Sequence, residues 1–331
     1  MNYTEEGYID LSWIGKDFRK AMQKGMLVPN DLCGPSYHGY WIYEGDSTYF
    51  LKIPNSYSLT KEETLKRIYT ELLAEELATI VGLNVIETKV ATLNKKRPSL
   101  AMISRSYLRD GYETISGADI AMEYLTFLEK SQDPLTKQNL LFEYFEERTV
   151  DDLLHHSFKK YEYNSLEFIW ASLLYHFRYS KNKLSQVSSI MQKLTKRYIF
   201  SFIMMQQDYH LKNWEIQENE SSAFLSPMYD LDLGLKEKFD SKKNNSMRSY
   251  MDSFSSVYED FERFYTSSSD EVKKEVEKQM SLLNPEAIFQ SMKIIEDKYP
   301  YVFPDELKEM FLKIQGAHFE ELKSITKNYH L

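Results

Sequence analysis

The sequence predicts an α+β protein in two parts, a smaller part of mixed strands and helices followed by a larger, mostly helical part. Short runs rich in aromatic and β-branched residues outnumber helical patterns up to about residue 106, and helical spacing of apolar residues dominates beyond it. The 331 residues are also enough for about two cores. We place the boundary near residue 108, between parts 1–108 and 109–331.

The composition is that of a folded, acidic protein. Hydrophobic residues make up 42% of the chain and aromatic residues 15%, so broad aromatic packing is expected. The formal net charge of −9 opposes nonspecific attachment to DNA or anionic membranes, and we predict neither as a direct partner. The single cysteine, Cys33, excludes an internal disulfide and a cysteine-rich metal site.

The first residues lack the basic stretch followed by an apolar stretch that is typical of a secretory signal peptide. No apolar run reaches the roughly 18 residues that span a bilayer. This favours a cytoplasmic protein. Delivery elsewhere by a dedicated secretion system would leave no such mark.

Local patterns divide the first part into elements. Apolar residues at helical spacing predict an amphipathic helix over 11–24, ended by Gly25. Two aromatic-rich segments, 40–43 and 48–53, flank a Gly-containing turn and predict a hairpin. A long helical pattern covers 59–81. Two further strands are expected, over 83–93 and 99–103.

Lys52 interrupts an apolar strand of that hairpin. Such a lysine either sits on an edge strand with its ammonium in solvent or meets an acid. The helix over 59–81 offers three candidate acids, Glu71, Glu75 and Glu76.

The second part is dominated by helical patterns, and prolines stand near three of the expected helix starts. The expected helices cover about 133–148, 162–178, 181–206, 270–297 and 304–328.

An acid, an amide and a second acid follow one of these helices. Asp208 precedes Asn213, and the segment 214–225 reads as a hairpin that would bring Asp230 back beside Asn213. One unligated carboxylate plus an Asn and an Asp is the set that phosphoryl transfer with magnesium requires. A polar loop that caps a helix is the simpler alternative, but the nearly continuous apolar run 197–205 before it indicates a buried helix that anchors the loop.

The histidines do not suggest a zinc site. His155 and His156 are adjacent on a helical pattern and would point about 100° apart, and no second ligand stands at helical spacing from His176. His210 lies between the predicted acid and amide, so we assign it to shaping the loop by hydrogen bonds.

At these residues the sequence resembles the HipA-like serine/threonine kinases, in a short form that lacks the N-terminal subdomain. Asp208-x-His210-x-Lys212-Asn213 looks like the catalytic loop of the family, and Pro227-x-Tyr229-Asp230 looks like its metal-binding segment. The strand around Lys52, and Glu71 placed 11 residues before Gly82, extend the resemblance over roughly 49–232.

The resemblance implies a bilobal protein-kinase-like fold that uses ATP and Mg²⁺. In the catalytic loop, Asp208 and His210 would serve the reaction, and Asn213 and Asp230 would bind the metal. Lys52 would contact phosphate and be held by Glu71, and the backbone near Ser104 and Ser106 would meet the adenine.

By resemblance, the chain would phosphorylate a protein such as a translation component, as the toxin of a toxin–antitoxin pair. A DNA-binding antitoxin or a small accessory subunit is the expected partner. Ser36, in a loop with two glycines and a proline, is either an autophosphorylation site or an ordinary turn residue. Two alternatives stay open: a small-molecule or lipid phosphotransferase on the same architecture, and a nucleotide-binding pseudokinase without turnover.

Overall fold

The computed structural model describes ten segments of the chain, namely residues 2–5, 7–30, 37–55, 60–94, 99–130, 166–205, 211–229, 231, 255–299 and 305–329. They form two compact units. The first unit combines residues 1–107 and 278–331 with Leu231, and the second combines 108–229 with 254–277. We describe each unit by itself.

A six-stranded sheet forms the centre of the first unit. Its order is β1-β5-β6-β4-β3-β2, with antiparallel pairs except for the parallel pair of β1 and β5. The predicted hairpin is confirmed as β3 and β4, which pair from Tyr37 with Pro54 to Glu44 with Ser47. Gly45 in its turn has a φ of 58°, which favours glycine. The strands are β1 (Ile9–Asp10), β2 (Leu27–Asn30), β3 (Tyr37–Glu44), β4 (Ser47–Pro54), β5 (Thr88–Thr92) and β6 (Leu100–Arg105).

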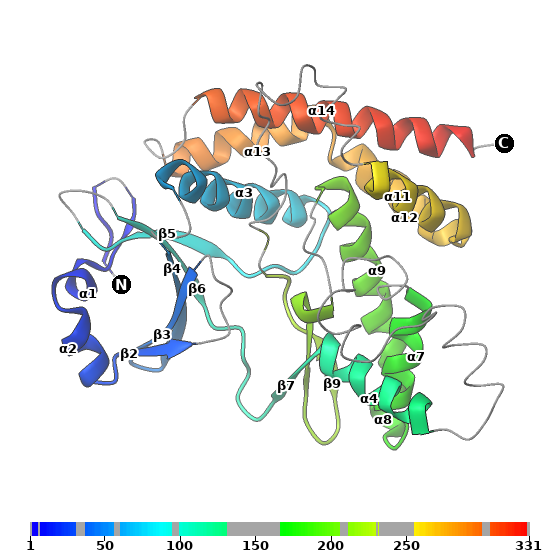
Figure 1. Ribbon diagram of the computed structural model, residues 1–331, viewed down its shortest axis with the longest axis horizontal. Helices are drawn as coiled ribbons and strands as arrows, with labels where there is room; N and C mark the ends of the chain where they lie inside the picture. The colour runs from blue at the N-terminus through cyan, green and yellow to red at the C-terminus, as the bar shows by residue number, and fades with distance from the viewer. Residues whose placement is uncertain are drawn as a thin grey trace. The chain divides into compact units, whose positions relative to one another are not determined.

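The two faces of this sheet are covered by different helices, because successive side chains of a strand point to opposite faces. Leu51 and Ile103 belong to a core cluster that also contains Ile14 of α1 (Ser12–Lys16) and Ala21 of α2 (Phe18–Gln23). On the other side, α3 (Lys61–Ile80) packs against β5, α13 (Pro285–Lys298) packs on α3, and α14 (Asp305–Asn328) packs on α13 (Figure 1).

The predicted long helix is confirmed as α3, and its start is specified locally. Thr60 accepts a hydrogen bond from the Glu63 backbone N–H, and the Glu63 carboxylate accepts one from the Thr60 N–H, which completes a capping box. The helix ends at Val81, and Gly82 follows with a φ of 73°.

Three features of the first unit differ from the sequence predictions. The helix expected over 11–24 is two helices, because Asp17 leaves the helical conformation and its carboxylate caps α2 through the Lys20 N–H. The strand expected over 83–93 covers only Thr88–Thr92. The short strands β1 and β2 were not predicted.

In the second unit, three helices pack with a small sheet. The sheet has the order β7-β8-β9, and all its pairs are antiparallel. The core contains Leu128 of α4, Leu173 of α7, Leu194 of α9 and Trp214. The elements are β7 (Glu113–Ser116), α4 (Gly117–Lys130), α7 (Leu166–His176), α8 (Lys181–Leu184), α9 (Val187–Ile203), β8 (Glu215–Glu218), β9 (Ala223–Leu225) and α11 (Ser255–Ser267).

The C-terminal helices agree partly with expectation. The pattern over 270–297 is divided into α12 (Asp270–Leu282) and α13, because Asn284 caps α13 and Pro285 occupies its first position. The helix expected over 304–328 is α14. The helix expected over 133–148 lies outside the described residues. Among the helices that are described, none has the length and apolar character needed to cross a bilayer.

Candidate active site

The described residues include five of the predicted site residues. Lys52, Glu71, Ser104 and Ser106 belong to the first unit, and Asn213 belongs to the second. The predicted catalytic pair Asp208 and His210, the predicted metal ligand Asp230, and Ser36 lie outside the described residues.

Lys52 lies on a strand with neighbours on both sides. It is paired with Gly39 of β3 and with Met102 of β6, so the edge-strand alternative is excluded. Its side chain is partly buried, and the Nζ atom lies 5.9 Å from the centroid of the Tyr37 ring. A partly buried lysine within a sheet needs polar partners for its charge, which is consistent with a functional position.

The three candidate acids of α3 differ in burial. Glu71 is 3% exposed and Glu75, one turn later, is 8% exposed, whereas Glu76 is partly exposed. Burial raises the pKa of the Glu75 carboxyl to about 7, although hydrogen bonding to Thr88 and the charges of Lys298 and Lys52 oppose the rise. The assignment of Glu71 as the acid that holds Lys52 stays a prediction.

Ser104 and Ser106 lie at the end of β6. Ser104 is paired with Phe50 and Thr88, so it shares the sheet face of Lys52. The Ser106 N–H donates to the Thr48 carbonyl over 2.8 Å, which extends the pairing of β6 with β4 by one residue. The backbone N–H of Ser106 is therefore engaged within the sheet. Contact of these residues with an adenine stays a prediction.

Asn213 is held in a short 3₁₀ turn, Leu211–Asn213, and is 8% exposed. The next residue, Trp214, is fully buried, and its carbonyl accepts a hydrogen bond from the Gly117 N–H over 2.9 Å. A Cβ on Gly117 would lie 2.3 Å from Cε2 of Trp214, so only glycine allows this approach. The turn that carries Asn213 is thus fixed by close packing.

The hairpin predicted over 214–225 is confirmed as β8 and β9. In its turn, the Asn219 Oδ1 accepts hydrogen bonds from the N–H groups of Ser221 and Ser222. After β9 the Ser226 N–H donates to the Glu215 carbonyl over 2.9 Å, so the returning chain lies beside the start of β8. The position of Asp230 beside Asn213 stays a prediction, because Asp230 lies outside the described residues.

Two residues that the sequence analysis did not single out support the returning chain. Arg197 of α9 is 2% exposed and donates from its guanidinium to the Ser226 carbonyl. The buried side chain of Gln217 accepts from the Arg109 N–H over 3.1 Å and donates to the Ser226 Oγ over 3.4 Å. The available signal was an arginine that begins the apolar run 197–205, because a buried charge is retained only where it has partners.

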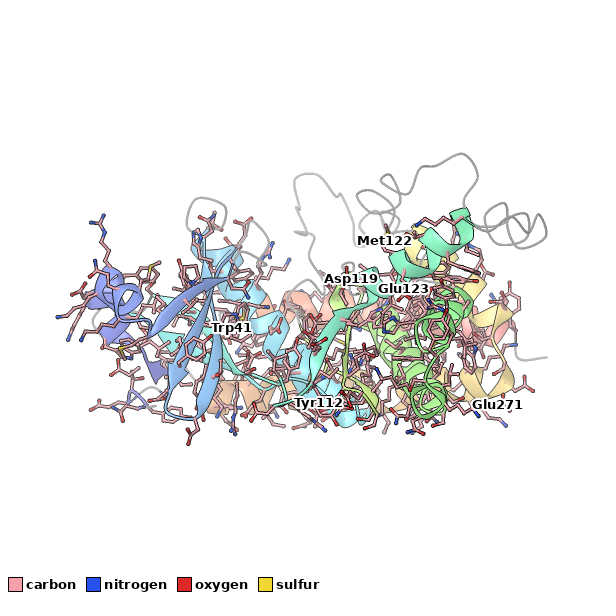
Figure 2. All side chains as sticks on the ribbon, turned by 90° about the horizontal axis from the view of Figure 1, so that it is seen from below. Trp41, Tyr112, Asp119, Met122, Glu123 and Glu271 are labelled. Atoms are coloured by element: carbon pink, nitrogen blue, oxygen red, sulfur yellow. The ribbon has the colours of Figure 1, made fainter. Side chains whose placement is uncertain are left out.

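His176 joins a network of polar and charged side chains at the end of β8. Its Nδ1 lies 2.6 Å from Oε2 of Glu123 on α4, and its Nε2 lies 3.5 Å from Oε1 of Glu218, the last residue of β8 (Glu123 is labelled in Figure 2). Arg178 contacts Glu123, and Lys183 contacts Glu218. Burial raises the pKa of Glu123, but hydrogen bonds from His176 and Arg178 outweigh it and hold this pKa below its ordinary value.

The chain is similar to known proteins both in family and in fold. A family model described as the HipA-like C-terminal domain matches residues 22–284. No curated protein sequence matches the chain. The proinflammatory kinase CtkA of Helicobacter pylori is similar in structure, with a TM-score of 0.58 and 13% identity over 97% of this chain and 99% of CtkA.

HipA of Shewanella oneidensis MR-1, solved in a toxin–antitoxin complex with HipB and operator DNA, gives a TM-score of 0.43 and 12% identity over 95% of this chain and 70% of HipA. The similarity to CtkA confirms the predicted α+β fold of HipA-like kinases. Because the family model spans most of the sequence, this chain belongs to the HipA-like family.

Proposed function

We propose that this chain is an ATP- and magnesium-dependent kinase of the HipA type, which transfers the γ-phosphate of ATP to a serine or threonine hydroxyl of a protein. The observation that carries the proposal is the position of Lys52 on a central strand, with its side chain partly buried. A lysine in this setting suits the task of binding phosphate oxygens. Membership of the HipA-like family supports the same activity.

Asn213 supports the metal assignment. Its side-chain oxygen is of the type that Mg²⁺ accepts as a ligand, and the packing of Trp214 against Gly117 fixes the turn that carries it. Asn213 and Asp230 would hold the ion, which neutralises the charge of the phosphates when bound. Glu71 would hold Lys52, and the backbone near Ser104 and Ser106 would contact the adenine.

The remaining roles belong to the loop before Asn213. Asp208 would orient the substrate hydroxyl and accept its proton as the bond to phosphorus forms. His210 would fix the conformation of the loop by hydrogen bonds. As finer proposals, the substrate is a translation component, the chain is the toxin of a toxin–antitoxin pair, and a DNA-binding antitoxin or a small accessory subunit is its partner. A cytoplasmic location and autophosphorylation of Ser36 stay predictions.

Transfer of label from [γ-³²P]ATP to proteins of a cell lysate tests the proposal. The wild-type chain with Mg²⁺ should label one or a few proteins on serine or threonine. Asp208→Asn should abolish labelling while it leaves ATP affinity nearly unchanged, because Asp208 contributes little to nucleotide binding. Lys52→Met should weaken ATP binding. Lys20 is an exposed lysine of the same unit, and Lys20→Met should leave ATP binding unchanged.

The outcomes separate the alternatives. Label on a lipid or small molecule alone would assign a different phosphotransferase. Binding of ATP without transfer to any acceptor would assign a pseudokinase. Full transfer by Asp208→Asn would remove this residue from the mechanism.

A further inference from the structure

Polar contacts hold the turn end of the β8–β9 hairpin to the segment around α8. Lys183 of α8 donates to Oε2 of Glu218, the last residue of β8, over 3.0 Å. On the other strand, the Ala223 N–H donates to Oε1 of Gln186 over 2.6 Å. The ring of His176, at the end of α7, also lies against Glu218. The proposed kinase mechanism assigns no role to these contacts.

The ring of His176 lies between two carboxylates that belong to different elements. Its Nδ1 is 2.6 Å from Oε2 of Glu123 on α4, and its Nε2 is 3.5 Å from Oε1 of Glu218 on β8 (Glu123 is labelled in Figure 2). The His176 side chain is only 13% exposed, so water can replace these partners only in part. The ring therefore joins α4 and α7 to the end of β8.

A cation already occupies the second oxygen of each carboxylate. Arg178 donates to Oε1 of Glu123 over 2.9 Å, and Lys183 donates to Oε2 of Glu218. The five side chains thus form one row, in which basic and acidic groups alternate, with His176 at its centre. The oxygens that face the ring are the remaining ones, and the ring nitrogens are placed to donate to both.

Only the charged form of the ring fits both neighbours. A carboxylate accepts hydrogen bonds but donates none, and a neutral imidazole carries a proton on one nitrogen only. With a neutral ring, one nitrogen lone pair would therefore face a carboxylate oxygen, and the two acceptors would repel each other. Burial raises the pKa of Glu123, but hydrogen bonds from His176 and Arg178 outweigh it and hold this pKa below its ordinary value, so Glu123 stays an acceptor at neutral pH.

We propose that His176 is a pH-sensitive switch, whose charged ring joins Glu123 to Glu218 and holds the turn end of the hairpin to α4 and α7. The closer contact, with Glu123, keeps the proton on Nδ1, so Nε2 is the atom that loses its proton to water as the pH rises. Glu218 then loses the ring as a donor and keeps Lys183. The hairpin follows the predicted metal ligand Asn213 in the chain, but the switch does not depend on the kinase assignment.

The contact should be present on the acidic side of neutrality and lost above it. An imidazole changes its charge between about pH 5 and 8, whereas carboxylates stay ionised there and the side chains of lysine and arginine stay charged. The groups that face the ring are the two carboxylates and, beyond them, Arg178 and Lys183, so the ring is the member of the row that titrates in this range. Stabilisation by the charged ring is thus fully present below this range and is lost as the pH rises through it.

Hydrogen exchange of the full chain, read by mass spectrometry at pH 6 and pH 8.5, tests the proposal. Exchange rates are first corrected for the pH dependence of an unprotected amide, and peptides that cover 215–225 report on the hairpin. In the wild type, protection of these peptides should be about fivefold lower at pH 8.5, because a hydrogen bond between the charged ring and Glu218 is lost. Peptides from the β3–β4 hairpin of the first unit should show no such difference.

His176→Gln removes the titrating ring, so protection of the hairpin should be the same at both pH values. His38 is an exposed histidine of the first unit, and His38→Gln should keep the wild-type difference. Glu218→Gln provides an amide N–H that can donate to Nε2 of a neutral ring, so the difference should disappear in this variant as well. If His176→Gln does not fold, as judged by circular dichroism, Glu218→Gln compared with His38→Gln decides the matter.

The protonation state of the ring can be observed directly by NMR in the full chain labelled with ¹⁵N-histidine. The ring signals that are missing from the spectrum of His176→Gln belong to His176, and they should show two protonated nitrogens at pH 6 and one at pH 8.5. Three results would overturn the proposal. These are a neutral His176 ring at pH 6, equal protection of the wild-type hairpin at both pH values, and a difference that persists in His176→Gln.

Discussion

The two units fix their predicted site residues by different physical means. In the first unit, Lys52 lies on a central strand and buried acids stand on α3, so charge is the dominant feature. In the second unit, Asn213 is fixed by shape, through Trp214 packed against Gly117 and through the returning chain attached to Arg197. The stability of the unit whose site is held by charge should therefore depend on pH. The stability of the unit whose site is held by packing should instead fall when a buried side chain is made smaller.

The largest loss of stability is expected when a large, fully buried side chain of the second unit is removed. Trp214→Ala should lower the free energy of unfolding by about 3–5 kcal/mol, because Trp214 is fully buried. Trp13→Ala, at a position that is 39% exposed, should cost far less. Denaturant titration of both variants measures the difference, and equal losses would contradict the role given to packing.

Arg197→Met tests whether the returning chain also depends on one charged donor. The variant should lose about 2–3 kcal/mol, because the Ser226 carbonyl stays buried without its guanidinium donor. Lys193→Met changes an exposed residue on the same helix and should be close to neutral. Chemical denaturation provides the measurement. A loss in Arg197→Met no larger than in its control would show that the hairpin alone positions the chain.

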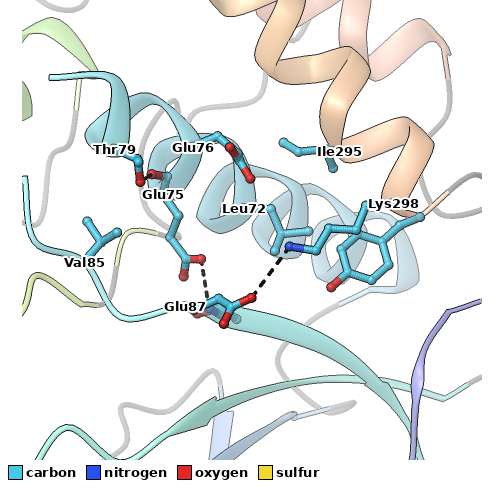
Figure 3. Close-up of a pocket in the computed structure, with 10 residues that line it drawn as sticks. Leu72, Glu75, Glu76, Thr79, Val85, Glu87, Ile295 and Lys298 are labelled. Atoms are coloured by element: carbon cyan, nitrogen blue, oxygen red, sulfur yellow. Dashed lines mark hydrogen bonds and ion pairs between the residues drawn. The ribbon is translucent and has the colours of Figure 1, made fainter. Parts of the chain in front are cut away.

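Glu75→Gln tests how the stability of the first unit depends on pH (Glu75 is labelled in Figure 3). Its folded-state pKa of about 7 lies above the unfolded value, so its contribution to stability decreases as the pH rises from the ordinary carboxyl range through 7. Glu75→Gln should match the wild type in stability at pH 5 and exceed it by roughly 2 kcal/mol at pH 8. Glu62→Gln, at an exposed position of α3, is the control. Parallel stability curves for the wild type and Glu75→Gln would contradict the expectation.

The smallest effect on stability is expected for Glu123→Gln, which removes a charged carboxylate from the second unit. Its pKa lies below the ordinary value, so its contribution is present above the carboxyl range and is lost as the pH falls through it. Because Glu123 is 40% exposed, solvent screening limits the cost of Glu123→Gln to about 0.5 kcal/mol at pH 7. Thermal melts at pH 7 and pH 3 measure it, and the difference from wild type should vanish at pH 3. An undiminished difference would assign the effect to packing.

Local signals explain which elements could be predicted from the sequence. The hairpin of β3 and β4 has aromatic strands and a glycine turn, and α3 has a capping box and a long periodic pattern, so both were predicted near their observed positions. β7 was not predicted, because its side chains are largely exposed and its existence depends on pairing with β8, which is about 100 residues away in the chain. The break at Asp17 was missed because one capping side chain decides it.

The candidate site was predictable to the extent that its residues are unusual in type. A lysine within an apolar strand is visible in the sequence, but its central position depends on the order of the strands, which is set by distant pairings. Arg197 and Gln217 were missed because their roles consist of contacts with backbone groups of other segments. A contact with a backbone group cannot be recognised from the residue types in the sequence.

The first unit is built from segments that lie far apart in the chain, and this affects how it forms during synthesis on the ribosome. Its sheet and α3 are translated long before α13 and α14, and the residues of the second unit are made in between. Tyr69 on α3 is fully buried and packs edge-on against Phe311 of α14 at 5.5 Å, and α13 packs along the same helix. The growing chain therefore exposes an apolar helix face until residues 278–331 emerge, and during that interval it is a natural client for chaperones.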